Sequence, residues 1–243
     1  MKRISFILLV FVFLGLYLFT YNSNSSFLDK EIKQTLFTSV AKPSWKIEMQ
    51  NTKDSFELHS LTATQEENKG VFLLDEPIFR SYWENKFRST ASSVYAILDL
   101  GEEKLLMTNN VHLTITERDE KIDLFSETIN FDMRNKNFRS KNQVQMKSTS
   151  FRLNSNGFDL FQNSNGVNEL IFSKAAFEEN NASKNSFYGE ADLIIYKSPS
   201  DTFTLKGSAE IKFESTLISA EEIEFNFKTK KIISSKRSKI IKS

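Results

Sequence analysis

Side chains able to perform catalysis or to hold a metal ion are few in this sequence. The two histidines, His59 and His112, each fall on the polar side of an alternating segment, and there is no cysteine. Thiolate nucleophiles, disulfides and multi-histidine metal sites are therefore not expected. Neighbouring glutamates such as Glu66-Glu67 and Glu221-Glu222 point to opposite faces of a strand, so they cannot share a proton-transfer site. We predict that the protein is not an enzyme and needs no cofactor or metal.

Charged residues are balanced over the chain as a whole, with 32 basic and 31 acidic side chains. This balance gives no reason to expect a nucleic-acid partner. The last segment is different, because seven basic residues and no acidic residue occur between positions 228 and 243. Two interpretations remain open: a solubilising end that discourages strand aggregation, or a basic surface for an anionic lipid or an acidic partner.

Hydrophobic and polar residues alternate from Trp45 onward, in short segments separated by turn-forming residues. Clear examples are residues 111–115, 129–133, 209–213 and 223–227. A period of two is typical of strands with one buried face and one face in water. The sequence therefore predicts an all-β fold, as a sandwich, a roll or a barrel.

Two features indicate how these strands connect. Residues 105–113 and 124–131 match residues 203–211 and 217–225, which favours a repeated strand pair that extends the sheet along one axis. The sequence Asn-Ser-Asn-Gly at residues 154–157 recurs nine residues later. Because Asn-Gly readily adopts the positive φ angles of a tight hairpin, we expect hairpin turns at both copies.

The N-terminus carries an apolar segment that follows two basic residues. Lys2 and Arg3 precede residues 4–19, which contain no charged side chain and predict a helix that spans a membrane. Because the positive end stays in the cytoplasm, we expect the chain from about residue 22 onward to lie outside it. A cleaved signal peptide is the alternative, although the apolar run is long for one and no A-x-A cleavage site follows it.

The segments behind this anchor follow a particular order. They are residues 55–63, a proline-containing step at 71–79, and residues 89–91, 105–113, 122–131 and 140–146. In this order they resemble the LptC family, the inner-membrane-anchored periplasmic subunits of the lipopolysaccharide export machine. The resemblance covers about residues 1–180. Residues 188–234 resemble one more repeat of the related LptA/OstA type, so this chain looks longer than a usual LptC protein.

The resemblance implies a twisted, open β-jellyroll preceded by one transmembrane helix, whose two sheets enclose an apolar groove for acyl chains. The protein would be held at the inner membrane, with its bulk in the periplasm. It would accept lipopolysaccharide from the LptB–LptF–LptG transporter and hand it to an LptA-like protein. We expect an anchor at 1–21, a linker at 22–43, an LptC-like jellyroll at 44–182 and an LptA/OstA-like repeat at 183–243.

Strand alternation and the resemblance together nominate site residues. Those expected to line the lipid groove are Phe72, Leu74, Ile78, Met107, Val111, Leu113, Ile129 and Phe131. Those expected at the edge that docks a partner are Ala209, Ile211, Ile223, Phe225, Ile232 and Ile233. The alternative function is an anchored structural or adhesive protein of the envelope with a solid core. A secreted enzyme is disfavoured by the residue inventory.

Overall fold

The computed structural model describes residues 38–48, 54–65, 70–83, 86–117, 120–162, 168–180 and 187–242, all within one compact unit. Apart from a single 3-10 turn at Ser198–Ser200, the regular structure of these residues is entirely β, which confirms the all-β prediction. The expected transmembrane helix lies outside the described residues. Over the part of the chain that is described, no helix is long and apolar enough to cross a membrane.

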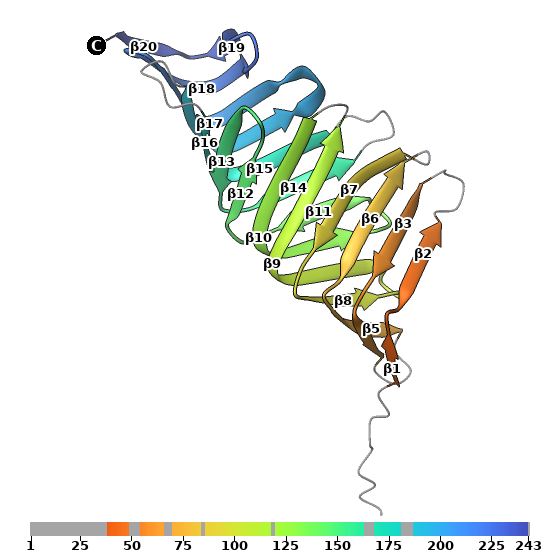
Figure 1. Cartoon of the computed structure of the whole chain (residues 1–243). Helices are drawn as coiled ribbons and strands as arrows, with labels where there is room; N and C mark the ends of the chain where they lie inside the picture. Colours follow the sequence, from red (N-terminus) through yellow and green to blue (C-terminus); the bar gives the residue numbers. More distant parts are fainter. Residues whose placement is uncertain are drawn as a thin grey trace, which may run out of the picture. The chain divides into compact units, whose positions relative to one another are not determined.

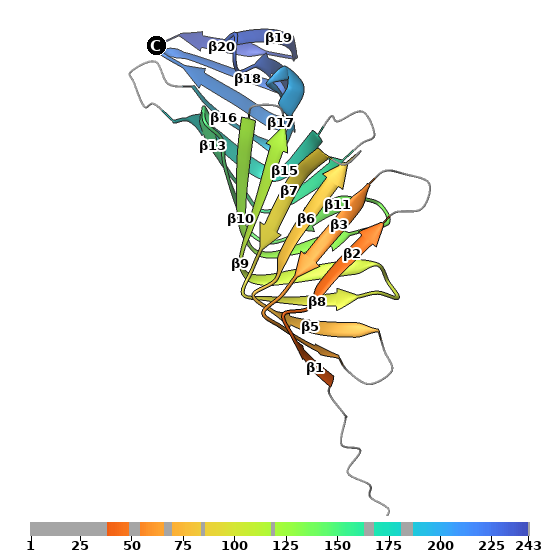
Figure 2. The same cartoon turned by 45° about the vertical axis from the view of Figure 1, so that its right-hand side comes forward.

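The described residues contain 20 antiparallel strands in one hydrogen-bonded network, and its pairings separate it into two layers (Figures 1 and 2). The strands found only in the first layer are β1 (Thr38–Ala41), β4 (Thr62–Gln65), β5 (Val71–Asp75), β8 (Tyr95–Asp99), β11 (Asn137–Ser140), β14 (Phe158–Gln162) and β19 (Lys231–Lys236). Those found only in the second layer are β2 (Ser44–Glu48), β3 (Ser55–His59), β6 (Ile78–Trp83), β7 (Lys86–Ser92), β12 (Val144–Lys147), β13 (Phe151–Ser155) and β20 (Lys239–Lys242).

Six longer strands run through both layers. They are β9 (Lys104–Glu117), β10 (Glu120–Asp132), β15 (Asn168–Glu179), β16 (Tyr188–Lys197), β17 (Thr202–Phe213) and β18 (Thr216–Asn226). One half of β9 pairs with β8 in the first layer and the other half pairs with β7 in the second. The long strands therefore join the layers along a line of bends. β1, which falls in the stretch expected to be a linker, is part of the first layer through its pairing with β4.

In β9 and β17 the bend occurs where the backbone takes a left-handed conformation. β9 bends at Asn109 and Asn110, with φ angles of 64° and 58°, and its register with β10 shifts there. β17 bends at Gly207 and Ser208, with φ angles of 70° and 47°, and its registers with β16 and β18 both shift. Glycine and asparagine tolerate positive φ best. The two positions are equivalent in the sequence repeat, so the repeat corresponds to the same bend in two strand pairs.

The tight hairpin predicted at residues 154–157 is wrong. β13 ends at Ser155 in the second layer, whereas β14 begins at Phe158 in the first layer, and the two strands do not pair with each other. Neither Asn156 nor Gly157 adopts the positive φ that a tight hairpin needs. The turn carries the chain across the line of bends instead. The second copy of this motif lies outside the described residues.

Candidate functional site

The space between the two layers is filled by a continuous cluster of apolar side chains. Six of the residues nominated for an apolar groove have 0–1% of their surface exposed: Leu74, Met107, Val111, Leu113, Ile129 and Phe131. Phe72 is partly buried against the same cluster. These seven residues share one interior, and their contact with lipid stays a prediction.

Ile78 is on the opposite face of its strand, and the prediction that it faces the interior is wrong. Its side chain is 41% exposed, whereas Phe79 and Ser81 of the same strand are 1% and 2% exposed. Two adjacent apolar residues leave the parity of a strand undecided in the sequence. The larger Phe79 takes the interior position, where its ring centroid lies 5.6 Å from that of Phe56 and 4.7 Å from that of Phe131.

Aromatic rings gather in two clusters within this interior. In the first, centroids are 4.4–5.9 Å apart among Phe56, Phe79, Phe131 and Phe138. In the second, contacting centroids are 4.1–6.5 Å apart among Phe151, Phe177, Phe187, Tyr196, Phe203, Phe213, Phe225 and Phe227. Buried hydroxyls pair with each other, as in the 2.6 Å contact between Ser81 and Ser89. The interior therefore offers non-directional apolar contacts.

One end of the interior is bordered by β1 and β2, and its apolar surface is incompletely covered. Residues paired across strands point to the same face, so Val40, opposite buried Ala63, and Trp45, opposite buried Leu58, both face inward. Val40 is nevertheless 49% exposed. The ring of Trp45 meets that of Phe72 edge-on at 5.6 Å, beside a pocket of about 330 Å³. Sequence reasoning missed these residues, because nothing local marks the last strand of a layer.

At the other end of the interior, four residues nominated for a docking edge lie inside the molecule. Ala209, Ile211, Ile223 and Phe225 belong to β17 and β18 and are 0–1% exposed, so the prediction that they form an edge is wrong. The reason is that β19 and β20 both pair with β18 and cover it. The edge lies one strand further along the chain.

Strands β19 and β20 form this edge, since within the described ranges each pairs with β18 alone. The nominated Ile232 and Ile233 lie on β19 and are 39% and 55% exposed. Ile232 stands opposite buried Phe225, and Ile240 stands opposite Ile218, so both face inward. Ile240 is 61% exposed because no described strand follows. The interior thus stays apolar up to the last strand of each layer.

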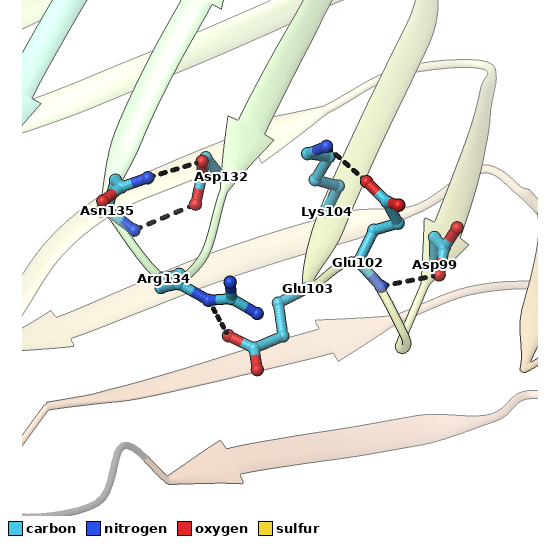
Figure 3. A network of polar contacts seen from close by, with 7 residues as sticks. All are labelled: Asp99, Glu102, Glu103, Lys104, Asp132, Arg134 and Asn135. Carbon is cyan, nitrogen blue, oxygen red and sulfur yellow. Dashed lines mark hydrogen bonds and ion pairs between the residues drawn. The ribbon is translucent and has the colours of Figure 1, made fainter.

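The ends of the layers remote from the bends carry charged turns, which we call the first and second rims after their layers. At the first rim, a polar network holds the turns between β8 and β9 and between β10 and β11 (Figure 3). Arg134 Nε lies 3.3 Å from Glu103 Oε2, and Lys104 Nζ lies 2.5 Å from Glu102 Oε2. The backbone amide of Asn135 donates to Asp132 at 2.9 Å. A charged rim therefore borders an apolar interior.

Two lysines of the first rim reach carboxylates of the second rim. Lys136 pairs with Asp54, and their side chains are 18% and 6% exposed; we call this pair the buried clasp. Lys230 Nζ lies 2.7 Å from Glu179 Oε1, and their side chains are 34% and 25% exposed; we call this pair the accessible clasp. The partners are 82 and 51 residues apart in the sequence, so no local pattern indicates either pair.

His112 has partners that the sequence did not indicate. Its Nε2 lies 2.8 Å from Asp123 Oδ1, Thr114 Oγ1 donates to the same oxygen at 2.6 Å, and its ring stacks on Phe125. Burial disfavours the carboxylate, but the hydrogen bonds from Thr114 and His112 outweigh it and lower the pKa of Asp123. The group lies on the outer face of the second layer. Among the residues described, no group of three or more histidine or acidic side chains could hold a metal.

Two protein-family models match the chain. The model described as "Lipopolysaccharide-assembly, LptC-related" matches residues 6–171. The model described as "LptA/(LptD N-terminal domain) LPS transport protein" matches residues 121–231. The second match includes most of 188–234, where an LptA-type repeat is expected, and it overlaps the first match from 121 to 171.

Among solved structures, the chain is similar to LptH, the LptA homologous periplasmic component of the lipopolysaccharide transport device of Pseudomonas aeruginosa. The two are 16% identical, the similarity covers 52% of this chain and 98% of LptH, and the TM-score is 0.47. No curated protein sequence matches the chain. Because the first family model extends over more than half of its residues, the chain belongs to the lipopolysaccharide-assembly, LptC-related family.

Proposed function

We propose that this protein is an anchored periplasmic bridge that carries lipopolysaccharide from the inner membrane toward the outer membrane. It accepts lipid from an LptB–LptF–LptG transporter and passes it through the interior to an LptA-like protein. The observation that carries this proposal is an interior that remains apolar from β1 and β2 to β19 and β20 and is exposed at both ends. Stacked β-structures that stand alone need polar capping at both ends, whereas here inward-facing apolar side chains such as Val40 and Ile240 stay exposed at the last strands.

The interior can accept acyl chains because its contacts carry no directional preference. Each methylene group of an acyl chain that leaves water contributes about 0.8 kcal/mol of favourable free energy. This gain offsets the free-energy cost of displacing the side chains that fill the space between the layers. A charged sugar headgroup stays at the rims, where Arg134 and Glu103 are exposed to water. This division between rim and interior matches the two halves of an amphiphilic lipid.

Photo-crosslinkers at inward-facing and outward-facing positions of the same strands test the path of the lipid. Crosslinkers placed at Val111 and Phe131, which face inward, should capture lipopolysaccharide in cells. Crosslinkers at their neighbours His112 and Asn130, which face outward, are the matched controls and should not capture it. Equal labelling of both parities, or no labelling at the inward positions of a folded variant, would replace the proposal with a structural envelope protein that has a solid core.

A truncation tests the docking of the LptA-like partner. Ending the chain after Lys230 removes β19 and β20 but keeps β17, β18 and the accessible clasp. This variant should still co-purify with the transporter and should lose the LptA-like protein, because the two strands whose unpaired backbone groups and inward isoleucines would receive the partner are gone. Capture of that partner at full strength would place the docking edge elsewhere on the chain.

The retained anchor has its own test. A reporter fused after Ser243 should be active only outside the cytoplasm, and the mature chain should keep residues 1–21. An N-terminus at or beyond Asn22 would show cleavage and contradict the anchor, without affecting the proposal for the interior.

A further inference from the structure

A pocket of about 340 Å³ opens between the two layers beside the accessible clasp. Thr149 and Glu179 line it from the second layer, and Lys228 and Lys230 line it from the first. Its floor is aromatic, because Phe151 and Phe227 also line it, with their centroids 5.2 Å apart. Both rings belong to the second aromatic cluster, so the pocket lies where the charged rims meet the apolar interior.

Lys230 occupies the boundary between the charged rims and this aromatic floor. Besides its contact with Glu179, its ammonium group lies 4.0 Å from the ring centroid of Phe227 and 4.7 Å from that of Phe187. Attraction between a cation and an aromatic face persists when the carboxylate turns away. Two rings therefore hold Lys230 in place to receive a different anion.

The two clasps differ in whether an anion from solvent can reach them. Asp54 and Lys136 of the buried clasp are 6% and 18% exposed, so an incoming ligand has little access to either charge. Glu179 and Lys230 of the accessible clasp are 25% and 34% exposed, and Glu179 can turn into water by giving up this ion pair and a 3.4 Å hydrogen bond from the backbone amide of Phe187. The buried clasp is suited to a permanent contact, and the accessible clasp is suited to exchange.

The charges and the shape of the pocket indicate what that anion is. With Glu179 turned away, Lys228 and Lys230 face the remaining pocket carboxylate, Asp201, which accepts a 3.4 Å hydrogen bond from Tyr196. A phosphate monoester accepts charge-assisted hydrogen bonds from two ammonium groups. Because Phe151 and Phe227 are only 2% and 5% exposed, an attached acyl chain enters the interior beside them by displacing side chains.

We propose that this pocket is a binding site for the phosphate of an acylated lipid, in which Lys230 exchanges Glu179 for the phosphate. The inference rests on the proposed transport of lipopolysaccharide and names one contact between the rims and the headgroup. In this site the two residues of the accessible clasp have different roles: Lys230 binds the phosphate, and Glu179 competes with the phosphate for Lys230.

Substitution of each half of the clasp in the full chain tests this assignment. The measurement is equilibrium binding of bisphosphorylated lipid A, and of the same lipid after phosphatase treatment. We expect Lys230→Gln to weaken binding of the phosphorylated lipid about fivefold and Glu179→Gln to strengthen it by a similar factor, the effect of one exposed charge contact. Binding of the dephosphorylated lipid should change with neither substitution. Lys136→Gln, which removes the buried clasp, is the control for the loss of an ion pair between the rims. Changes of the same sign for both variants, on both lipids, would overturn the site and leave a purely structural clasp.

Two further measurements separate this site from the proposed function and from binding of free phosphate. Capture of lipid by a crosslinker at Phe131 but not at Thr149 would overturn the site and leave the transport proposal standing, whereas capture at neither position would overturn both. Inorganic phosphate should compete with the phosphorylated lipid only weakly, because it lacks the acyl chain. Equal or tighter binding of inorganic phosphate would overturn the assignment to a lipid.

Discussion

The substitution Gly189→Ala tests how closely the interior is packed in the second aromatic cluster. Gly189 on β16 stands opposite Phe177 on β15, and a Cβ atom there would lie 2.4 Å and 2.6 Å from two carbons of the Phe177 ring. That ring has little room to move, because it stacks on Phe203 at 4.5 Å with the planes 15° apart. Overpacking of this kind costs about 1–3 kcal/mol, and the lower chain entropy of alanine in the unfolded state offsets about 0.4–1 kcal/mol. We therefore expect a net loss of about 1–2 kcal/mol in the free energy of unfolding.

Urea unfolding of the full chain, followed by fluorescence, measures this loss. Gly101→Ala is the matched control, because the nearest atom to a Cβ there is an Asp99 oxygen at 3.4 Å. In a double-mutant cycle, Phe177→Leu should relieve part of the clash, with a coupling energy of about 1 kcal/mol between the two positions. Equal stability of the Gly189→Ala and Gly101→Ala variants, or additive effects in the cycle, would refute the argument. The Phe177 ring would then have room to move away from position 189.

Three other perturbations probe the interior, the open edge and one titratable group. Val111→Arg should block lipid capture at inward positions, because an unpaired charge in an apolar interior costs on the order of several kcal/mol; circular dichroism checks that the variant folds. Ile233→Pro should reduce pull-down of an LptA-like partner while leaving thermal stability nearly unchanged, because Ile233 has no register partner on β18 and the open edge loses one amide donor. The hydrogen bond from Tyr188 to Glu190, together with burial, raises the pKa of Tyr188 to about 12. Ultraviolet titration should therefore show one tyrosine that ionises at high pH, and Glu190→Gln should lower the pKa of that tyrosine toward its ordinary value. Because the folded pKa is the higher one, this contact stabilises the fold fully below a pH of about 10, and its contribution is lost as the pH rises through about 12.

Strand parity could be predicted wherever polar and apolar residues alternate without ambiguity. Val111, Leu113, Ile129 and Phe131 face the interior as the period of two predicts. Parity failed at Ile78, where two apolar residues are adjacent and the packing of Phe79 decides the face. The local pattern predicts that successive side chains alternate between the two faces of a strand, but it cannot decide which of two adjacent apolar residues takes the interior position.

Connections between strands were harder to predict than the strands themselves. The Asn-Gly sequence at residues 154–157 is typical of a hairpin, yet the strands on either side of it belong to different layers. At Asn109 and Gly207, by contrast, residues that tolerate positive φ lie at the bends of two long strands. A turn-forming residue marks where the backbone changes direction, and the pairing of distant strands decides which direction it takes.

The all-β class, the apolar face of most strands and the repeated strand pair could be predicted from the sequence, because each depends on residues that are neighbours along the chain. The tertiary structure alone decided that β19 and β20 form the open edge and that Val40, Trp45 and Ile240 border the ends of the interior. It also brought Lys136 to Asp54 and Lys230 to Glu179, across 82 and 51 residues. Such contacts depend on how the two layers meet, and the period of a single strand carries no information about a partner in the other layer.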